Sequence, residues 1–435
     1  MYNALTGMGG GGTADTFFVN EGNTALSVTF TVCSLLGAPI YNIFGHWVLL
    51  PAGLCYVLYT GSFLTPNGGF TIAAAAILGI GAGFLWTAQA GIMMSYPSED
   101  QKGRAFGIFW MVFNLGATMG GAILLGLNYN STGGENRVTL GTYIGFMVIM
   151  AFGALLALTL AHPSKVLRGD GARVSLHKYS NVRREAWEVF KLFTDWRMLI
   201  LIPLFIGSNW FYTYQFQVFN GGGYFDIRGR ALNNFLYWLF QIFGGGFIGW
   251  LCDRQFLGKR RQRAFVVNTF VLCVCVALWA GATAFQRRFD NASILIIKAD
   301  PTLQMTVGSP GYGGICFLYA MFGFMDSIYQ GFAYWLMGTL TNDTERAARY
   351  GGFYKTIQNI GGAAASQVAA NNTNFMTQLI IVFVINVVGL LLSFVVCWTV
   401  PDTTVEEIDN LEGVEGKETV VGGHLENDPV EKVEA

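Results

Sequence analysis

The sequence has few charged residues and few residues of the kinds that build soluble catalytic sites. Only 12% of its 435 residues are Asp, Glu, Lys or Arg, about half the share that a soluble globular domain carries. No Gly-rich loop followed by Lys and Ser or Thr is present, which disfavours a nucleotide-driven pump. Its four His residues lie in loops or in the C-terminal tail: His46, His162, His177 and His424. We therefore expect no metal site and no cofactor.

Other classes are excluded by charge and by cysteine spacing. The net charge of -1 leaves no basic excess to neutralise phosphates, so nucleic acid is not an expected partner. The seven Cys residues fall in or beside apolar runs, without metal-ligand spacing to His, and are expected to behave as small apolar side chains. No nucleophile with a matching base stands out, so we do not expect an enzyme.

Long apolar runs dominate what is present. Hydrophobic residues make up 53% of the chain, and 56 residues are Gly, which is frequent in membrane helices because it lets backbones approach closely. Roughly 20 mostly apolar residues cross a bilayer. By that rule the spans are expected near 24–44, 47–64, 70–96, 105–127, 140–161, 198–219, 231–251, 264–285, 313–340, 351–370 and 375–400. The lipid bilayer is thus the first expected partner.

Four parts of the chain are expected. An N-terminal transmembrane half covers 1–161, and a C-terminal transmembrane half covers 198–400. Between them, 162–197 carries eight Lys or Arg residues and apolar residues at helical spacing, which predicts a linker with a helix on the membrane surface. The tail, 401–435, is acidic and lacks aromatics, so we expect it to be disordered.

The basic residues predict an orientation. The linker holds eight Lys or Arg residues and loop 252–263 holds five, against six in all the loops on the opposite side. Because cytoplasmic loops carry the excess of Lys and Arg, the linker and the tail are expected to be cytoplasmic. Three glycosylation-type triplets then fall on the outer side, at Asn130, Asn291 and Asn371.

An internal repeat relates the two halves. A segment from Arg104 to Gly116 matches one from Arg349 to Gly361, with Arg, Gly, aromatic, Asn and Gly at a constant offset of 245. Each copy opens a span directly after a short loop. Chance similarity among Gly-rich and aromatic-rich helices is the alternative.

A loop motif in the second half supports the same division. Gly249 is followed by Asp253 and Arg254, and then by Gly258, Lys259 and Arg260. This pattern resembles the loop signature Gly-x-x-x-Asp-Arg-x-x-Gly-Arg-Lys of the major facilitator superfamily, with one extra residue before Gly258. The first half has Ala38 for Gly and Asn42 for Asp. The resemblance implies a gating loop at Asp253, Arg254, Gly258, Lys259 and Arg260, and two six-helix halves.

The expected fold class is therefore an all-α membrane protein, a major-facilitator-type bundle of two six-helix halves. Six spans follow the linker and only five precede it, so a first helix is expected to be missing, leaving about 11 transmembrane helices. The chain further resembles fungal members of the uncoordinated-93-like branch. The resemblance is carried by Gly81 to Gln89, Lys102 to Asn114, Asp326 to Trp335 and Arg349 to Gln358. This resemblance implies the fold and a membrane location, but it does not indicate a substrate. The founding member of the branch resembles a partner protein that regulates a channel.

Polar residues are unevenly distributed among the expected spans. In the superfamily fold some of these helices line or flank the cavity and others face lipid. Six of the first kind hold 14 Asn, Gln, Asp, Glu, Lys or Arg residues, whereas the four that face lipid hold 3. A polar side chain in hydrocarbon is costly, so we expect cavity candidates among the first group. They are Gln89, Asn114, Asn209, Gln217, Asn233, Gln241, Asp326, Gln330, Lys355, Gln358 and Asn359. Hydrogen bonding between packed helices is the alternative role for each Asn or Gln.

Two functions fit these observations. The first is a secondary transporter with alternating access for an unknown small solute, in which Asp326 and Lys355 face each other and serve proton coupling or recognition of solute charge. The second is a non-transporting membrane partner that regulates or escorts a channel or another membrane protein. The sparse polar content of the first half favours the second, whereas the Asp326 and Lys355 pair favours the first.

Overall fold

The computed structural model describes residues 2–3, 17–65, 67–128, 140–160, 182–371 and 373–403, and these are almost entirely helical. Within those ranges the only β pairing is an isolated bridge between Phe225 and Met305. The long helical segments are α2 (Phe17–Phe44), α3 (Leu49–Ser62), α4 (Gly68–Ser95), α5 (Lys102–Asn128), α6 (Leu140–Leu156), α8 (Trp196–Ile200) continued by α9 (Ile202–Tyr212) and the π-helix η6 (Thr213–Asn220), α10 (Ile227–Cys252), α11 (Arg260–Gln286), α13 (Tyr312–Thr339), α14 (Thr344–Ala370) and α15 (Phe375–Trp398). Each expected span overlaps one of these segments, and the all-α membrane class is confirmed.

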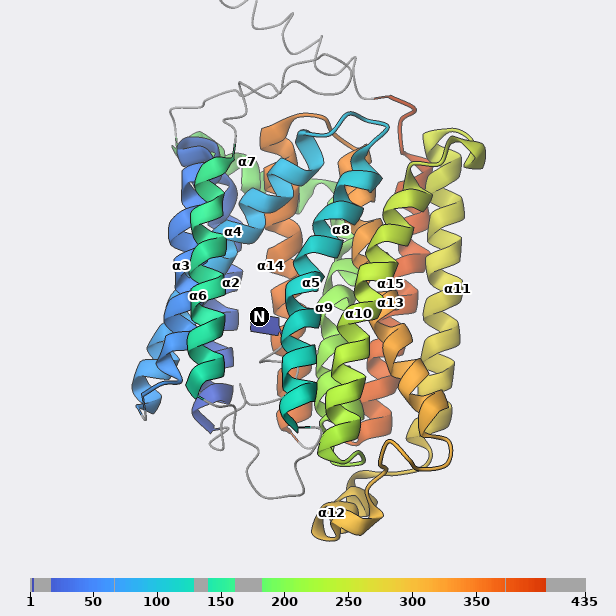
Figure 1. Ribbon diagram of the computed structural model, residues 1–435. Helices are drawn as coiled ribbons and strands as arrows, with labels where there is room; N and C mark the ends of the chain where they lie inside the picture. The colour runs from blue at the N-terminus through green and yellow to red at the C-terminus, as the bar shows by residue number, and fades with distance from the viewer. Residues whose placement is uncertain are drawn as a thin grey trace, which may run out of the picture.

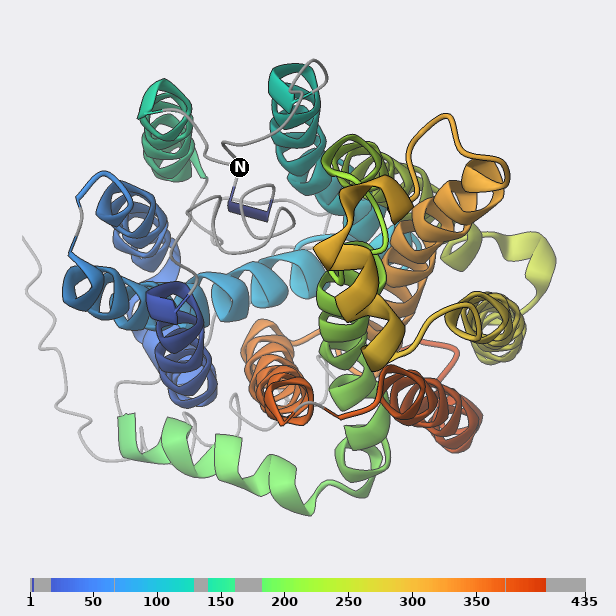
Figure 2. The ribbon, with the colours of Figure 1, turned by 90° about the horizontal axis from the view of Figure 1, so that it is seen from below.

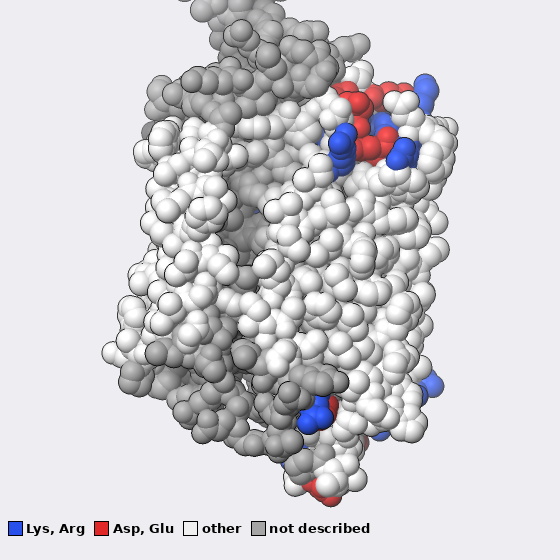
Figure 3. Space-filling model, in the orientation of Figure 1, with Lys and Arg blue, Asp and Glu red and all other residues white. Residues whose placement is uncertain are grey.

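The surface of the bundle is that of a membrane protein. Among the described residues, six helices are long and apolar enough to cross a bilayer by themselves: α2, α4, α5, α10, α11 and α15. Large apolar side chains point outward at mid-helix, including Val112, Val148 and Phe152, each more than 60% exposed. On the face drawn in Figure 3, the coloured Lys, Arg, Asp and Glu residues gather toward the two ends of the molecule, with an uncharged band between them. Such a band fits the hydrocarbon core of a bilayer.

The two long helices that carry a carboxylate or an ammonium group near their middle lie inside. Helix α13 is buried along most of its length, and α14 is buried along its first half. Each carries an ionisable residue near its middle, Asp326 on α13 and Lys355 on α14. Since a charge facing lipid is costly, these two helices are placed where neighbouring helices and polar side chains can surround that charge.

Two lobes meet along the centre of the molecule. We call α2 to α6 the first lobe and α8 to α15 the second lobe. Helices α3 and α6 stand at one outer edge and α11 at the other (Figure 1). Helix α5 packs against α10, and α14 packs against α2 and α4. Viewed along the bundle, α4 runs obliquely from the outside of the first lobe to the centre (Figure 2).

Glycine allows a close backbone contact between the lobes where α5 crosses α10. A Cβ atom added at Gly107 would lie 2.8 Å from the carbonyl oxygen of Gly245, and one at Gly249 would lie 2.9 Å from the Cα of Gly107. A Cβ atom added at Gly103 would lie 2.7 Å from the carbonyl oxygen of Gly249. Backbones this close exclude any side chain, so glycine at these positions fixes where α5 and α10 cross.

Short helices cover the two ends. Helix α7 (Val182–Lys191) lies at the end we call the linker end, with Trp187 exposed and Val189 buried. Helix α12 (Asn291–Ala299) lies at the opposite, far end. Asp226 begins α10 by accepting a hydrogen bond from the backbone N–H of Gly229, and Asp343 begins α14 in the same way, as N-cap residues do.

Several predicted features lie outside the described residues: most of the linker, the tail beyond 403 and Asn130. The other two glycosylation candidates lie at the far end. The Oδ1 atom of Asn291 accepts a hydrogen bond from the backbone N–H of Phe375 at 3.0 Å. Asn371 is exposed, and its amide donates to the Gln367 carbonyl one turn earlier in α14. Modification of all three stays a prediction.

Candidate functional site

Asp326 is fully buried in the second lobe and accepts hydrogen bonds from four neutral side chains. Its Oδ2 atom accepts from the Tyr212 hydroxyl at 2.7 Å, the Tyr237 hydroxyl at 3.1 Å and the Gln241 amide at 2.6 Å. Its Oδ1 atom accepts from the Gln330 amide at 2.6 Å. Hydrogen bonds to a carboxylate are about twice as strong as neutral ones, so α9, α10 and α13 are tied together around this one side chain.

Lys355 is the buried cation nearest to this carboxylate in the hydrogen-bond network. Its ammonium group donates to Gln358 Oε1 at 2.8 Å. The Gln358 amide donates to Gln330 Oε1 at 3.0 Å, and the Gln330 amide donates to Asp326. We call Lys355, Gln358, Gln330 and Asp326 the relay. Asp326 and Lys355, expected to face each other, are connected through two glutamine amides, and in the part of the chain that the structure describes no ion pair within 4.0 Å joins them directly.

Aromatic rings enclose the cationic end of the relay. The Lys355 Nζ atom lies 4.2 Å from the centre of the Trp86 ring and 5.1 Å from that of Tyr354. A ring face attracts a cation at this range. Trp86 belongs to α4, so the ammonium group of the second lobe rests on a ring of the first lobe.

The first lobe also reaches the acidic end. The indole N–H of Trp110, on α5, donates to Gln241 Oε1 at 3.0 Å and to Ser327 Oγ at 2.8 Å. Gln241 in turn donates to Asp326. Trp110 and Lys355 are equivalent positions in the sequence repeat. One glutamine connects Trp110 to the Asp326 carboxylate, and two glutamines connect Lys355 to it. The relay is therefore placed at the junction of the two lobes.

The remaining candidates lie elsewhere. Asn233 is buried nearer the far end, where its amide donates to Asn220 and its carbonyl accepts from Tyr312. Asn114 and Asn359 are buried and donate to carbonyls of their own helices. Gln89 donates to the sulfur of Met93 at 3.3 Å. These contacts are local or helix-to-helix. Asn359 donates to the backbone carbonyl of Lys355, and none of the contacts involves a side chain of the relay.

Asn209 and Gln217, two candidates in the span expected near 198–219, do not share one face of their helix. Asn209, Thr213 and Gln217 are four residues apart, but Thr213–Asn220 is a π-helix. A π-helix closes its turns with i to i+5 hydrogen bonds, so a spacing of four no longer keeps one face. Asn209 is half-buried, Gln217 is exposed, and Gln215 is buried and accepts from the Tyr237 hydroxyl at 2.9 Å.

A second polar cluster joins the two lobes at the linker end. Lys102, the first residue of α5, is buried, and its ammonium group donates to the Gly338 carbonyl at 2.6 Å, the Thr341 carbonyl at 2.8 Å and Asn342 Oδ1 at 2.6 Å. These acceptors lie at the C-terminal end of α13, where a cation is favoured by the helix dipole. One side chain of the first lobe thus seals the end of a helix of the second.

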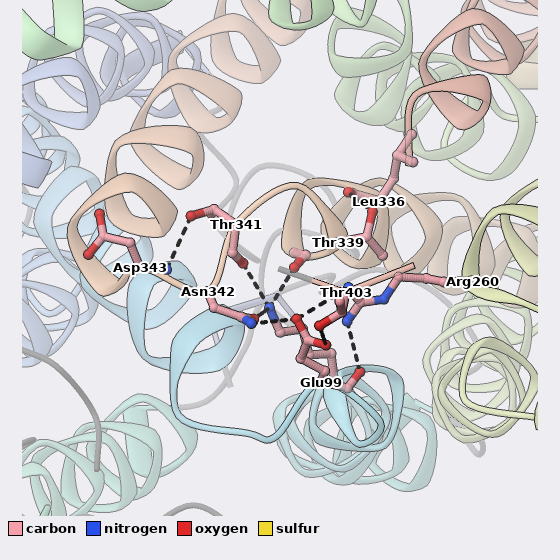
Figure 4. Close-up of polar contacts among 10 residues, drawn as sticks. Glu99, Arg260, Leu336, Thr339, Thr341, Asn342, Asp343 and Thr403 are labelled. Atoms are coloured by element: carbon pink, nitrogen blue, oxygen red, sulfur yellow. Dashed lines mark hydrogen bonds and ion pairs between the residues drawn. The ribbon is translucent and has the colours of Figure 1, made fainter. Parts of the chain in front are cut away.

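Glu99 adds a second connection between the lobes. It lies in the loop before α5, where its carboxylate accepts from the Asn342 amide and pairs with Arg260 at 3.4 Å (Figure 4). Arg260 is 5% exposed. We call Lys102, Glu99, Arg260 and Asn342 the latch.

The predicted gating loop adjoins the latch. The Asp253 carboxylate accepts from the backbone N–H groups of Gly103 at 2.9 Å and Arg104 at 2.6 Å, so it caps the start of α5 across the lobe junction. Gly258 has a φ of 93°, a left-handed conformation that favours glycine. The other two positions point outward: Arg254 lies 4.6 Å over the Trp250 ring, and Lys259 pairs with Asp402 at 3.5 Å.

Asp253 predicts a pH dependence of the closed linker end. Burial raises its pKa to about 6, with Asp100 adding to the rise and the N–H groups of Arg104 and Gly103, with Arg263, opposing it. If the lobes part, water surrounds the carboxylate and its pKa returns toward 3.8. The closed end then binds the proton more tightly than the open end does. The closed end is therefore stabilised at pH values below the ordinary pKa of 3.8, and this stabilisation is lost as pH rises through about 6.

We therefore expect the two lobes to separate more at the linker end at about pH 7 than at about pH 4. Spin labels at the exposed positions Gln101 and Gln255 measure that distance. Asp253→Asn, which has no titrating group, should remove the change in this pH window. A pH profile that is the same with and without Asp253 would contradict the assignment.

Several of these residues were missed by sequence reasoning. Tyr212, Tyr237 and Tyr354 were not counted as polar, although each places a hydroxyl in the network around the relay. The buried contacts of Lys102 were not predicted either. Its position two residues before the repeated segment, which begins at Arg104, was the available signal. Among the described residues no group of three or more His, Cys, Asp or Glu side chains could hold a metal ion.

The fold is that of the major facilitator transporters. The structure is similar to the crystal structure of the human organic anion transporter MFSD10, with a TM-score of 0.58 at 15% identity over 87% of this chain and 83% of that one. It is also similar to the major facilitator transporter FucP in the outward conformation, with a TM-score of 0.59 at 13% identity over 92% and 93% of the two chains. At such identities the likeness shows the fold alone. Together with the apolar helices, it defines a multi-pass integral membrane protein with this fold.

Within that class the chain belongs to the UNC-93 family. The family model described as "Ion channel regulatory protein UNC-93" matches residues 19–397. UNC93-like protein 1 of Arabidopsis thaliana is 40% identical over 386 residues, which cover 88% of this chain and 83% of that protein. A UNC93-like protein of Schizosaccharomyces pombe is 38% identical over 420 residues, covering 94% and 81%. The resemblance seen in the sequence is confirmed.

Proposed function

We propose that this chain is a secondary transporter that works by alternating access, with the relay as the place where a solute or proton is bound. The observation that carries the proposal is the relay itself. It places a buried ammonium group and a buried carboxylate in the middle of the bundle, joined by two amides and contacted by both lobes. Ionisable residues inside membrane spans commonly mark solute or proton pathways.

The geometry favours a role for charge at each end of the relay. Asp326 is surrounded by neutral donors that would also tolerate its protonated form, since hydroxyl groups and amides can reverse their hydrogen bonds. Lys355 makes one hydrogen bond among the described residues and rests on Trp86, so its other two N–H donors suit an anionic group of a solute. The solute class we propose is therefore small and negatively charged, with proton coupling at Asp326.

The latch supports alternating access. It joins the lobes at the linker end only, through a buried Lys and a buried Arg. Closure of one end around a site at the midplane is what a rocking bundle requires. We propose that this structure is closed toward the linker end and that opening the latch exposes the relay to that side.

We further propose that the linker end faces the cytoplasm, because the linker and loop 252–263 carry most of the basic residues. A membrane-impermeant thiol reagent applied to the non-cytoplasmic side should label a cysteine placed at the exposed position Arg287 and leave one at Lys259 unlabelled. Because a cysteine is introduced at each end of the molecule, each of the two variants serves as the control for the other. Labelling of Lys259→Cys alone would reverse the orientation.

A second candidate function is regulation or escort of another membrane protein. The family's description as an ion channel regulatory protein favours it. The two functions are separated by comparing metabolites in cells that lack the protein with those in wild-type cells, and then by offering the altered solutes to vesicles containing the full-length protein. A transporter accumulates at least one of them in the absence of any partner. A regulator accumulates none.

A further inference from the structure

The chain that leaves α15 crosses the latch. The Thr403 hydroxyl donates to Glu99 Oε2 at 3.0 Å (Figure 4). The preceding residues are held by the start of α11: Asp402 pairs with Lys259 at 3.5 Å, and the Val400 carbonyl accepts from Arg261 at 3.5 Å. Thr403 itself is exposed. A modifiable hydroxyl therefore lies on the outside of the latch, in direct contact with its only carboxylate.

This contact spans the lobe junction. Glu99 belongs to the first lobe, whereas Thr403, Arg260 and Asn342 belong to the second. Glu99 is thus held by three groups of the second lobe, and the Thr403 hydroxyl is the most exposed of them.

The sequence around Thr403 fits an enzyme that selects acidic substrates. Thr403 is followed by Thr404, Val405, Glu406 and Glu407, which places a carboxylate three positions after the hydroxyl. Kinases discriminate substrates by charge patterns of this kind. We propose that Thr403 is a phosphorylation site for an acid-directed protein kinase, and that its modification loosens the latch. The inference rests on the proposed cytoplasmic orientation and on alternating access.

The chemistry is a single phosphoryl transfer from a nucleoside triphosphate. A bond forms between Thr403 Oγ1 and the γ-phosphorus as the bond from that phosphorus to the bridging oxygen breaks. The nucleoside diphosphate leaves, and the hydroxyl proton passes to the base of the kinase.

The direction of the effect follows from which lobe each group belongs to. A phosphate carries about −1.5 to −2 charges at pH 7, and here it would stand beside the Glu99 carboxylate, which it repels. It would also compete with Glu99 for Arg260, which bonds Glu99 through both its carboxylate and its carbonyl oxygen. A pair between the Thr403 phosphate and Arg260 would lie entirely within the second lobe. It would replace the Arg260–Glu99 pair, which joins the two lobes, and so weaken the connection between them.

A native cysteine reports on the junction beneath the latch. Cys252 is 1% exposed at the end of α10, and a Cβ atom added at Gly103 would lie 2.8 Å from its Cβ. Parting the lobes at the linker end exposes this thiol to water. The full-length chain would keep Cys252 and carry alanine at the other six cysteines, Cys33, Cys55, Cys273, Cys275, Cys316 and Cys397.

The experiment treats this chain in nanodiscs with an acid-directed kinase and ATP, maps the modified residue by mass spectrometry, and follows labelling of Cys252 by a water-soluble maleimide at constant pH. Phosphorylation at Thr403 should speed labelling about tenfold, as expected for like charges in contact at a protein surface. Thr403→Glu should give a smaller increase without kinase. Thr403→Val should abolish the response to kinase.

A matched control adds the same charge far from the latch. Thr302 is exposed at the far end, where its hydroxyl also donates to a carboxylate, that of Asp300 at 2.7 Å; Thr302→Glu should leave Cys252 labelling unchanged. Lys102→Met, which opens the latch directly, should speed labelling whatever happens at Thr403. If Lys102→Met speeds labelling while the kinase modifies a residue other than Thr403, or while phosphorylation of Thr403 leaves labelling unchanged, the inference about Thr403 is wrong, although the latch itself is supported. If Lys102→Met also has no effect, the closed latch itself is wrong.

Discussion

Replacing either end of the relay alone is expected to damage the protein more than replacing both ends together. Lys355→Met leaves the Asp326 carboxylate buried without its cation, and Asp326→Asn leaves the ammonium group without its anion. Removing one partner of a buried pair commonly costs about 3–5 kcal/mol, whereas replacing both is often close to neutral. Each single variant should therefore lose roughly that much stability, and the double variant should recover most of it.

Thermal unfolding of the purified protein, followed by tryptophan fluorescence, measures these differences. In the double variant the Gln241 and Gln330 amides can turn to satisfy the amide that Asp326→Asn introduces, because both oxygen and nitrogen are available to them. The matched controls are Lys298→Met and Asp300→Asn, the same substitutions at exposed far-end positions, which should change little. A double variant as unstable as the worse single variant would show that the two charges are independent.

The second large effect is expected where α5 and α10 cross. Gly249→Leu would place a side chain where its first atom lies 2.9 Å from the Gly107 Cα atom, against backbone that cannot move aside without separating the helices. Overpacking a tight contact costs about 1–3 kcal/mol even when side chains can adjust, and here only backbone is available. We expect misfolded or very low yields of protein.

Gly153→Leu is the control for this prediction. Gly153 is exposed on α6, and nothing lies within 4 Å of a Cβ atom added there, so the same substitution should leave the yield and unfolding temperature unchanged. Size-exclusion profiles of the two variants from matched cultures give the comparison. Normal folding of Gly249→Leu would mean that α5 and α10 do not approach as closely as the structure shows.

Much of the fold was predictable because it depends on the length of the apolar runs in the sequence. Runs of about 20 apolar residues identify spans whatever their neighbours are, and each predicted span overlaps a helix. The repeat from Arg104 and from Arg349 placed equivalent helices in the two lobes. The family assignment followed from the same segments.

The site was less predictable because it depends on how side chains pair across helices. The sequence identified Asp326 and Lys355 as buried ionisable residues, but spacing within one helix gives no distance to another. The intervening Gln330 and Gln358 were recognised as polar neighbours and not as a bridge. The π-helix at Thr213–Asn220 has no distinct sequence pattern, so the change of face at Gln217 was not foreseen.

Uptake by the purified protein tests the central claim most directly. Proteoliposomes containing the full-length chain would be offered a mixture of small anionic metabolites across a pH gradient, and their contents identified by mass spectrometry. The account predicts that at least one solute accumulates with the wild-type protein and with the Lys298→Met control. It also predicts that accumulation is lost in a folded Asp326→Asn/Lys355→Met variant. Equal accumulation by that double variant, or none by the wild-type protein beyond protein-free liposomes, would contradict it.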